Sequence, residues 1–192
     1  MKIGVLALQG DFAEHIAILS RIGIASAEIR LPRHLLDIDA LIIPGGESTT
    51  IGKLATDFKM IEPLRRFGEE KPVWGTCAGA IFLSKDVRRS QPLLELMDIR
   101  IERNAFGRQV NSFQTDLDVP VLRSISEVAK PYPAVFIRAP LIETVEGEAK
   151  VLASLPDGRI VAAQQNRLLA TAFHPELTLD DRFHRYFAAM IG

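Results

Sequence analysis

The sequence has few of the features that mark membrane, secreted or nucleic-acid-binding proteins. One cysteine in 192 residues excludes a disulfide framework and a multi-cysteine metal site, and it favours a reducing compartment such as the cytoplasm. No apolar run approaches the ~20 residues that span a bilayer, and the short run at 3–8 is too short for a secretory signal. The formal net charge is −1, so we expect neither nucleic acid nor an anionic membrane as the main partner.

The composition is that of an ordinary globular domain. Hydrophobic residues make up 47% and charged residues 24% of the sequence, which excludes intrinsic disorder. The sequence contains no internal repeat, linker or low-complexity tract. We therefore expect residues 1–192 to form a single domain, a length within the usual range of roughly 100–200 residues.

The first half of the chain alternates short apolar runs with amphipathic runs. The apolar runs predict buried strands, and the amphipathic runs predict helices. The predicted strands cover 2–8, 25–31, 39–43 and 72–75, and the predicted helices cover 12–21, 49–68 in two pieces, and 78–85. Asp11 is predicted to cap the first helix. This alternation predicts an α/β fold with a mostly parallel central sheet and helices on both faces.

The second half of the chain is richer in short strands. Strands are predicted at 99–102, 112–119, 135–139, 151–155, 160–164 and 168–173. The pair Asp157-Gly158 predicts a hairpin turn between two of them. We therefore expect antiparallel strands that flank or extend the parallel sheet, followed by a final helix over 179–191.

The lone cysteine lies in a Gly-x-Cys-x-Gly pattern, from Gly75 to Gly79, between a predicted strand and a predicted helix. Small neighbours permit the sharp strand-to-helix turn that exposes a nucleophile above the edge of a sheet. The helix N-terminus favours a thiolate and offers free amides to an oxyanion. The alternative is a buried structural cysteine, which is the usual fate of an unpaired cysteine. The glycine frame favours Cys77 as a nucleophile.

A second candidate site is His174-Pro175-Glu176, which follows the apolar run 168–173. Residues two apart in extended backbone point the same way, so we expect Glu176 beside the imidazole of His174. Nucleophile, histidine base and orienting carboxylate form a triad by role. The alternative is a histidine at a strand end and a solvated glutamate. The other three histidines are interpreted as surface or packing residues: His15, His34 and His184.

A third candidate site is the glycine loop, residues 44–50, at the end of the third predicted strand. It fails the phosphate-loop pattern, because five residues rather than four separate Gly46 from Gly52, and Leu54 replaces the hydroxyl side chain that binds Mg²⁺. Glu47 would also repel a phosphate. The loop suits a neutral or zwitterionic ligand, with a peptide N–H of the glycine pair completing an oxyanion hole. A helix N-cap at Ser48 or Thr49 is compatible with this.

All three candidate sites follow predicted strands, at the sheet edge where α/β proteins bind ligands, and together they indicate a cysteine acyl-transfer enzyme. The cysteine pattern and the distant His-Pro-Glu resemble the class I, triad-type glutamine amidotransferases, whose fold is flavodoxin-like. The chain is similar, more narrowly, to the glutaminase subunits of pyridoxal 5′-phosphate synthase. This resemblance rests on six blocks: LQG at 8–10, PGGESTT at 44–50, GTCAG at 75–79, ERNAFGRQ at 102–109, FIRAP at 136–140 and FHPELT at 173–178. The segments 88–96 and 123–133 contribute nothing to it.

The resemblance implies hydrolysis of L-glutamine to L-glutamate and ammonia through a thioester. It implies that Cys77 attacks the side-chain amide, that His174 transfers the proton and that Glu176 orients His174. The implied glutamine-binding residues are Gly46, Glu47, Ser48, Arg103, Ile137 and Arg138, and the implied oxyanion hole uses Gly46 and Ala78. We infer that an Arg fork meets the α-carboxylate and that Glu47 accepts from the α-ammonium group; the alternative for Arg103 and Arg138 is a pair of surface salt bridges. No metal or cofactor is expected.

The resemblance also implies a partner, a separate synthase subunit that receives the ammonia and builds pyridoxal 5′-phosphate from a pentose phosphate and a triose phosphate. We expect a cytoplasmic hetero-oligomer in which the isolated chain is a poor glutaminase. The glycine pair Gly45-Gly46 can turn an oxyanion N–H out of the site, and a partner that binds only the competent orientation shifts that population. We expect the glycine loop and the Gln9-Gly10 turn to carry this signal.

Three alternatives stay open at this point: another class I glutaminase subunit, a cysteine hydrolase or repair protein on a similar sheet, and a binding module without catalysis. Repair proteins often place a carboxylate from the first strand's end beside the cysteine, and here that position is the neutral Gln9. The intact Cys77, His174 and Glu176 argue against a binding module.

Overall fold

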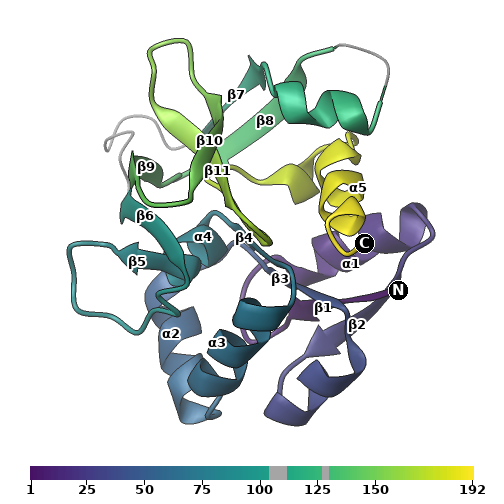
Figure 1. Cartoon of the computed structure of the whole chain (residues 1–192), viewed down its shortest axis with the longest axis vertical. Helices are drawn as coiled ribbons and strands as arrows, with labels where there is room; N and C mark the ends of the chain where they lie inside the picture. Colours follow the sequence, from purple (N-terminus) through teal and green to yellow (C-terminus); the bar gives the residue numbers. More distant parts are fainter. Residues whose placement is uncertain (104–111, 127–129) are drawn as a thin grey trace.

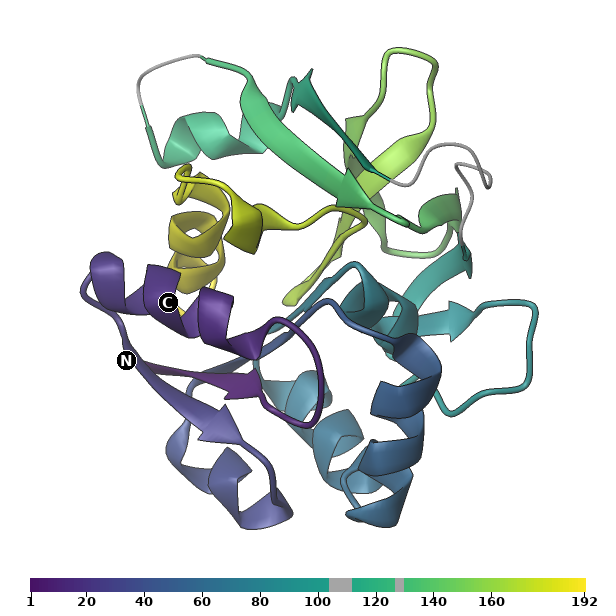
Figure 2. The same ribbon diagram turned by 180° about the vertical axis from the view of Figure 1, so that it is seen from behind.

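The computed structural model describes residues 1–103, 112–126 and 130–192 (Figures 1 and 2). The similarity block at 102–109 lies outside these residues from 104 onwards, as does part of the segment 123–133. Within the described residues, ten strands form one sheet in the order β2-β1-β3-β4-β12-β11-β9-β6-β5, with β10 paired to β11. A separate two-stranded sheet consists of β7 and β8.

One half of the main sheet is parallel. It consists of β2 (Ala25–Ile29), β1 (Lys2–Leu6), β3 (Ala40–Ile43), β4 (Val73–Thr76) and β12 (Leu168–Thr171). Every residue of β3, β4 and β12 is buried, as expected for strands covered on both faces. Because β12 pairs with β4 as well as with β11, the strand before it in sequence, residues far apart along the chain meet at one sheet edge.

The other half of the sheet is mostly antiparallel. It consists of β11 (Ile160–Gln165), β10 (Lys150–Ser154), β9 (Leu141–Val145), β6 (Met97–Glu102) and β5 (Ser84–Asp86), of which only β5 and β6 pair in parallel. The separate pair is β7 (Ser112–Leu117) and β8 (Tyr132–Ile137), also antiparallel. The predicted hairpin at Asp157-Gly158 joins β10 to β11. These strands confirm the antiparallel additions.

Two strands were missed by the sequence analysis, β5 and β9. The helix predicted to run to Lys85 ends at Leu83, and the chain continues directly into β5. Both missed strands carry charged residues and only β9 has more than one apolar residue, so neither presents the apolar run from which a strand is predicted. These segments become strands because they pair with β6, not because of a pattern in their own sequences.

Helices cover both faces of the sheet, as predicted (Figure 1). Apolar residues of α1 (Phe12–Arg21) and α5 (Arg182–Ala189) belong to one hydrophobic core, with the β7–β8 sheet. Those of α2 (Ser48–Asp57), α3 (Ile61–Glu70) and α4 (Ala78–Leu83) belong to the opposite core. Three short 3₁₀ helices, η1 (Pro32–Asp37), η2 (Pro120–Ser124) and η3 (Pro175–Leu177), complete the described elements. No helix in the described ranges is long and apolar enough to cross a membrane.

The final helix starts later than predicted, at Arg182 instead of residue 179. Asp180 explains the difference, because its carboxylate accepts a hydrogen bond from the Arg182 amide at 3.1 Å and pairs with the Arg182 guanidinium. Leu179 is left 90% exposed in the turn before the helix, so it adds nothing to the helix's buried face.

Candidate active site

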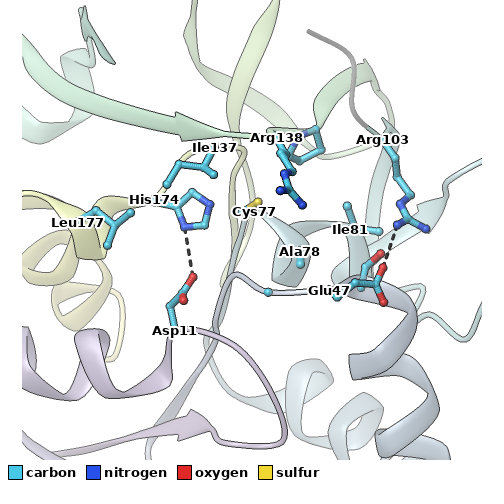
Figure 3. Close-up of a pocket in the computed structure, with 13 residues that line it drawn as sticks. Asp11, Glu47, Cys77, Ala78, Ile81, Arg103, Ile137, Arg138, His174 and Leu177 are labelled. Carbon is cyan, nitrogen blue, oxygen red and sulfur yellow. Dashed lines mark hydrogen bonds and ion pairs between the residues drawn. The ribbon is translucent and has the colours of Figure 1, made fainter. Parts of the chain in front are cut away.

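The nucleophile candidate Cys77 lies on the sharp turn between β4 and α4 that its glycine frame predicts. Its backbone has φ 48° and ψ −105°, a conformation that is rare for residues other than glycine. The Cys77 amide donates to the Thr171 carbonyl of the neighbouring strand at 2.8 Å, which fixes the turn to the sheet. The side chain therefore points from the sheet edge into a pocket, with little of its surface exposed (Figure 3).

The two glycines of the frame are required by close backbone contacts. A Cβ atom on Gly79 would lie 1.9 Å from the Ile43 carbonyl oxygen, and one on Gly75 would lie 2.5 Å from the backbone of Gly79. Any side chain at either position would push α4 away from β3 and β4. The Gly-x-Cys-x-Gly pattern is thus the sequence of a helix that starts against two strands.

The base candidate His174 pairs with Glu176 as predicted, although for a different structural reason. The strand predicted over 168–173 ends at Thr171, and η3 begins directly after His174. Glu176 therefore lies in a 3₁₀ turn and not in extended backbone, so the two-residue alternation argument was wrong. The turn still brings Glu176 Oε1 to 2.7 Å from His174 Nδ1, and both side chains are buried.

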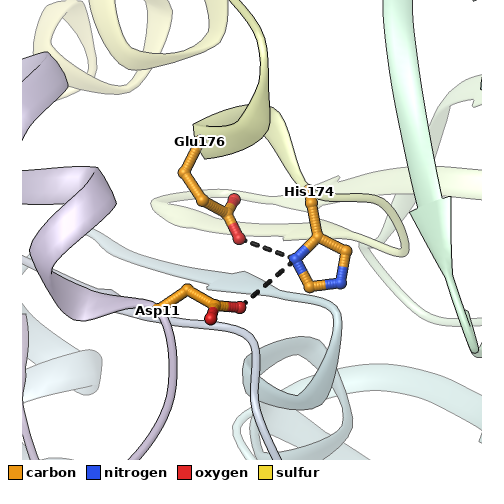
Figure 4. Close-up of side chains that lie close together, drawn as sticks. All are labelled: Asp11, His174 and Glu176. Atoms are coloured by element: carbon orange, nitrogen blue, oxygen red, sulfur yellow. Dashed lines mark hydrogen bonds and ion pairs between the residues drawn. The ribbon is translucent and has the colours of Figure 1, made fainter.

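A second carboxylate faces the same imidazole nitrogen (Figure 4). Asp11 Oδ2 lies 3.5 Å from His174 Nδ1. Asp11 occupies the N-cap position of α1 as predicted, but its side chain makes no capping hydrogen bond. The ligand-type atoms of Asp11, His174 and Glu176 lie within 4.8 Å of one another, a spacing that also suits a metal ion. A proton on Nδ1 would instead be donated to Glu176 Oε1 and face Asp11, and a protonated nitrogen cannot bind a metal.

The electrostatics of this group favour a positively charged imidazole. Burial alone would lower the pKa of His174, but hydrogen bonds and charge attraction from Cys77 and Glu176 raise it to about 10. Burial raises the pKa of Glu176, and the hydrogen bond and charge of His174 oppose that rise. His174 therefore carries its proton at neutral pH, between a sulfur and two carboxylates.

The glycine loop connects β3 to α2 and is held by the turn after β1. Gly46 has φ 155°, and a Cβ there would lie 2.5 Å from Gln9 Oε1. That Gln9 oxygen accepts a hydrogen bond from the Glu47 amide at 2.7 Å, and the Gly45 carbonyl accepts from the Asp11 amide at 3.0 Å. The Gln9 side chain thus holds the glycine loop in place. The carboxylate near the cysteine–histidine pair comes from Asp11.

Glu47 is the N-cap of α2, so the predicted cap at Ser48 or Thr49 is wrong. Its Oε2 accepts from the Thr50 amide at 2.7 Å and from the Thr49 and Thr50 hydroxyls. Burial would raise the pKa of Glu47, but these hydrogen bonds outweigh it and lower the pKa to about 2. Glu47 is therefore a fixed negative charge at the pocket rim.

Arg103, directly after β6, pairs with this charge on the same side of the pocket. Its Nη2 lies 2.9 Å from Glu47 Oε1, and its Nη1 donates to Gln91 Oε1 at 3.1 Å. Gln91 belongs to the segment 88–96, to which the sequence assigned no role, and its amide also donates to Ser48 Oγ at 3.4 Å. Arg103 thus belongs to the pocket and is not an isolated surface salt bridge.

The pocket has a volume of about 480 Å³, in the range of small-molecule sites. Figure 3 shows the Cys77 sulfur in its middle, with the His174 ring on one side and the Glu47–Arg103 pair on the other. Ile137 and Arg138 reach it from the end of β8. The lining residues predicted from the sequence are Gly46, Glu47, Ser48, Cys77, Ala78, Arg103, Ile137, Arg138 and His174; those not predicted are Asp11, Ile81, Pro140 and Leu177. Glu176 lies behind His174.

Comparison with known proteins identifies the family. The model of the SNO glutamine amidotransferase family matches residues 5–192. The chain belongs to this family. Two relatives share 55% identity with it: pyridoxal 5′-phosphate synthase subunit PdxT from Herpetosiphon aurantiacus, over 99% of this chain and 100% of its own length, and the same subunit from Moorella thermoacetica, over 100% of both chains.

Solved structures agree with the family assignment. A glutamine amidotransferase crystal structure superposes with a TM-score of 0.90 at 47% identity, covering 99% of this chain and 98% of its own. PurLQS from Thermotoga maritima shares the fold alone, with a TM-score of 0.71 at 14% identity over 100% of this chain and 98% of that chain. The family resemblance and the fold class predicted from the sequence are confirmed, and the cysteine repair alternative is wrong. The roles of individual site residues stay predictions.

Proposed function

We propose that this chain is the glutaminase subunit of a pyridoxal 5′-phosphate synthase, with residues 1–192 acting as one glutaminase domain. The relatives named PdxT support the assignment at high identity over the whole chain. The observation that carries the chemistry is the grouping of Cys77, His174 and Glu176 at the ends of the adjacent strands β4 and β12. A nucleophile, a protonated imidazole and an orienting carboxylate are what transfer of an acyl group to sulfur requires.

The reaction then proceeds in two halves. The Cys77 sulfur attacks the side-chain carbonyl carbon of glutamine, and His174 gives its proton to the departing nitrogen, which leaves as ammonia. Water attacks the resulting thioester while His174 takes a proton from it, and glutamate leaves as the bond to sulfur breaks, which restores the Cys77 sulfur beside a protonated His174. The amides of Gly46 and Ala78 would bind the oxyanion in both halves, since the first amides of α4 have no partner within the helix.

Glutamine binding would use the charge pair across the pocket. The backbone end of free glutamine carries one positive and one negative charge. These two charges complement the negative Glu47 and the positive Arg103. Arg103 would bind the α-carboxylate through its guanidinium fork, and Glu47 would accept from the α-ammonium group. Their present partners, Gln91 for Arg103 and Thr50 for Glu47, hold both groups in place before a ligand arrives. Ser48, Ile137 and Arg138 would complete the site.

The ammonia would pass to a separate synthase subunit, so the working enzyme would be a hetero-oligomer, and we expect it in the cytoplasm. The proposal on the partner is supported by the names of the relatives, which describe a subunit of a synthase. The chain's low cysteine content fits a reducing compartment.

The test measures ammonia release from glutamine with the synthase subunit present. We expect Cys77→Ala to lose all measurable hydrolysis while its thermal unfolding and circular dichroism match the wild type, because alanine fits the crowded turn. A glutamine-like chloroketone should label the wild type once per chain, since Cys77 is the single thiol. Asparagine is the matched substrate control and should release no ammonia. Hydrolysis that persists in pure Cys77→Ala protein would refute the proposed function.

A further inference from the structure

A buried row of polar side chains continues from Glu176 away from the pocket. Glu176 uses Oε1 for His174, and its other oxygen, Oε2, is buried without a well-aligned hydrogen bond from any described residue. His15 Nε2, from α1, lies 3.3 Å from that oxygen and 3.3 Å from Thr76 Oγ1. The His15 ring therefore stands directly behind the predicted triad, at the one carboxylate oxygen that the triad leaves unused.

A second buried histidine fixes the proton on His15. His15 Nδ1 lies 2.9 Å from His184 Nε2, from α5, and both residues are fully buried. Burial lowers the pKa of both rings, to about 3 for His184, so each is neutral and carries one N–H. If His184 donates from Nε2, then His15 must accept at Nδ1 and carry its own proton on Nε2, which lies 3.3 Å from both Thr76 Oγ1 and Glu176 Oε2.

The opposite assignment leaves a worse arrangement. With the two protons reversed, His15 would donate to His184 and present a bare nitrogen to the Glu176 carboxylate, which places two acceptors face to face. His184 would also hold an N–H at Nδ1, for which the described residues offer no acceptor. An unpaired buried donor is costly, and so is an uncompensated buried carboxylate oxygen. One chain of donors, His184 to His15 to Glu176, avoids both.

We propose that His15 is a positioning residue of the glutaminase reaction, whose Nε2–H holds the buried Glu176 carboxylate charged and aimed at His174, while His184 fixes the tautomer of His15. The inference rests on the proposed function, because it assigns a support to that triad. An N–H dipole 3.3 Å from Oε2 stabilises the charged form of Glu176, and a charged Glu176 in turn stabilises the proton on His174. The charged and titratable groups facing this network are Asp11 and His174 at Glu176, and Asp181 and Arg21 at His184.

A pure packing role for His15 makes a different prediction. The His15 ring meets Trp74 edge-on at 5.7 Å between centroids, a contact that any apolar ring or chain would partly replace. Packing alone would therefore tolerate His15→Leu as well as His15→Gln. A donor role predicts different results for the two variants. The Gln side-chain amide places an N–H close to the position of the His Nε2, and Leu has no donor.

The experiment follows the His174 titration by NMR on the full chain with labelled histidine, which has four histidine signals. In His15→Leu we expect the midpoint of the His174 titration to fall by about one pH unit or more. With the synthase subunit present, kcat should fall about tenfold or more while the KM for glutamine stays within about twofold, because the change lies behind the triad. His15→Gln should restore most of both, and His184→Phe should give a smaller shift in the same direction.

An unchanged His174 titration in His15→Leu, or equal losses in His15→Leu and His15→Gln, would overturn the inference. If His15→Leu does not fold, His184→Phe decides, because the proposal requires a shift in its His174 midpoint and packing alone gives none. The NMR readout needs no turnover, so it fails independently of the proposed function, whose own failure would be hydrolysis in Cys77→Ala.

Discussion

Histidines in this protein occupy two opposite electrostatic environments only a few side chains apart. His174 is held protonated by Cys77 and Glu176, whereas His15 and His184 are held neutral by burial. The stability contributed by His174 is present below its unfolded pKa near 6.5 and is lost as the pH rises through about 10. The buried pair, His15 and His184, has lowered pKa values, so the stability it contributes is lost as the pH falls. The free energy of unfolding therefore decreases both when the pH rises and when it falls from neutral.

The buried pair makes a prediction for acid unfolding. Below pH 6.5 the unfolded chain takes up protons on His15 and His184 that the folded chain refuses, so the free energy of unfolding falls as the pH falls toward about 3 for His184. Each such histidine contributes a slope of about 1.4 kcal/mol per pH unit. We expect urea unfolding between pH 6.5 and 4 to show a slope in His184→Phe that is smaller by about that amount. Equal slopes in both proteins would show that the folded chain protonates His184.

Arg103 makes a prediction for substrate binding. Removing its guanidinium leaves the α-carboxylate of glutamine without its charged partner, far from the amide that reacts. We expect Arg103→Ala to raise the KM for glutamine more than it lowers kcat, with a loss in kcat/KM of about 1.5–3 kcal/mol, the value of a charge-assisted hydrogen bond. Arg103→Lys should recover part of it. Steady-state ammonia release measures both constants.

The matched control for that measurement is Arg185→Ala, which removes an exposed arginine paired with Asp181 on α5. An exposed ion pair of this kind is worth little, so we expect its kinetic constants to match the wild type. A KM that is unchanged in Arg103→Ala would place Arg103 outside the glutamine site.

At the level of the elements, the site depends on how closely α4 starts against β3 and β4. Gly79→Ala would place a methyl group 1.9 Å from the Ile43 carbonyl, so the helix or the strand must move. We expect a loss of more than about 3 kcal/mol in the free energy of unfolding, above the ordinary cost of a core substitution, and loss of glutaminase activity. Urea denaturation measures the first.

Ala80→Gly is the control on the same helix, because it removes a methyl group instead of adding one. It should cost about 1 kcal/mol from helix propensity alone, plus the small loss of buried area. If Gly79→Ala were as stable as this control, the close contact between Gly79 and the Ile43 carbonyl would not contribute to stability.

The sequence was sufficient for the elements whose signals are local, and insufficient where the signal arises between elements. The apolar runs of β3 and β4 and the glycines around Cys77 are readable one segment at a time. Asp11 looked like a helix cap, because the sequence does not show that η3 brings His174 beside it. Gln91, likewise, is a polar residue in an unremarkable segment until β6 places Arg103 within reach.

The whole molecule brings its two ends together at the pocket. The turn Gln9–Asp11 holds the glycine loop through two hydrogen bonds, one to the Gln9 side chain and one from the Asp11 amide, and Asp11 also faces the His174 imidazole. A partner that moves this turn would therefore act on the oxyanion-binding loop and on the base at once. The arrangement provides a physical route by which a second subunit can control hydrolysis.

We accordingly predict that the isolated chain is a poor glutaminase and that the synthase subunit activates it. A missing oxyanion donor costs about 10²–10³ in kcat, which sets the expected size of the activation. Ammonia release is measured as the synthase subunit is titrated in, and Gln9→Ala, which frees the Glu47 amide, should change the activation more than it changes glutamine binding. Equal kcat/KM with and without the partner would contradict this control.

The central place of β12 has a consequence for how the protein is made. This strand lies between β4 and β11 although it is the last strand of the chain, and the His174 base follows it. While the ribosome is still synthesising the second half, the edge of β4 has no neighbour on that side, and Cys77 has neither the Thr171 carbonyl that fixes its turn nor a base. Nascent chains thus carry an open strand edge that favours chaperone binding or aggregation, and they cannot hydrolyse glutamine before the last strand has been inserted.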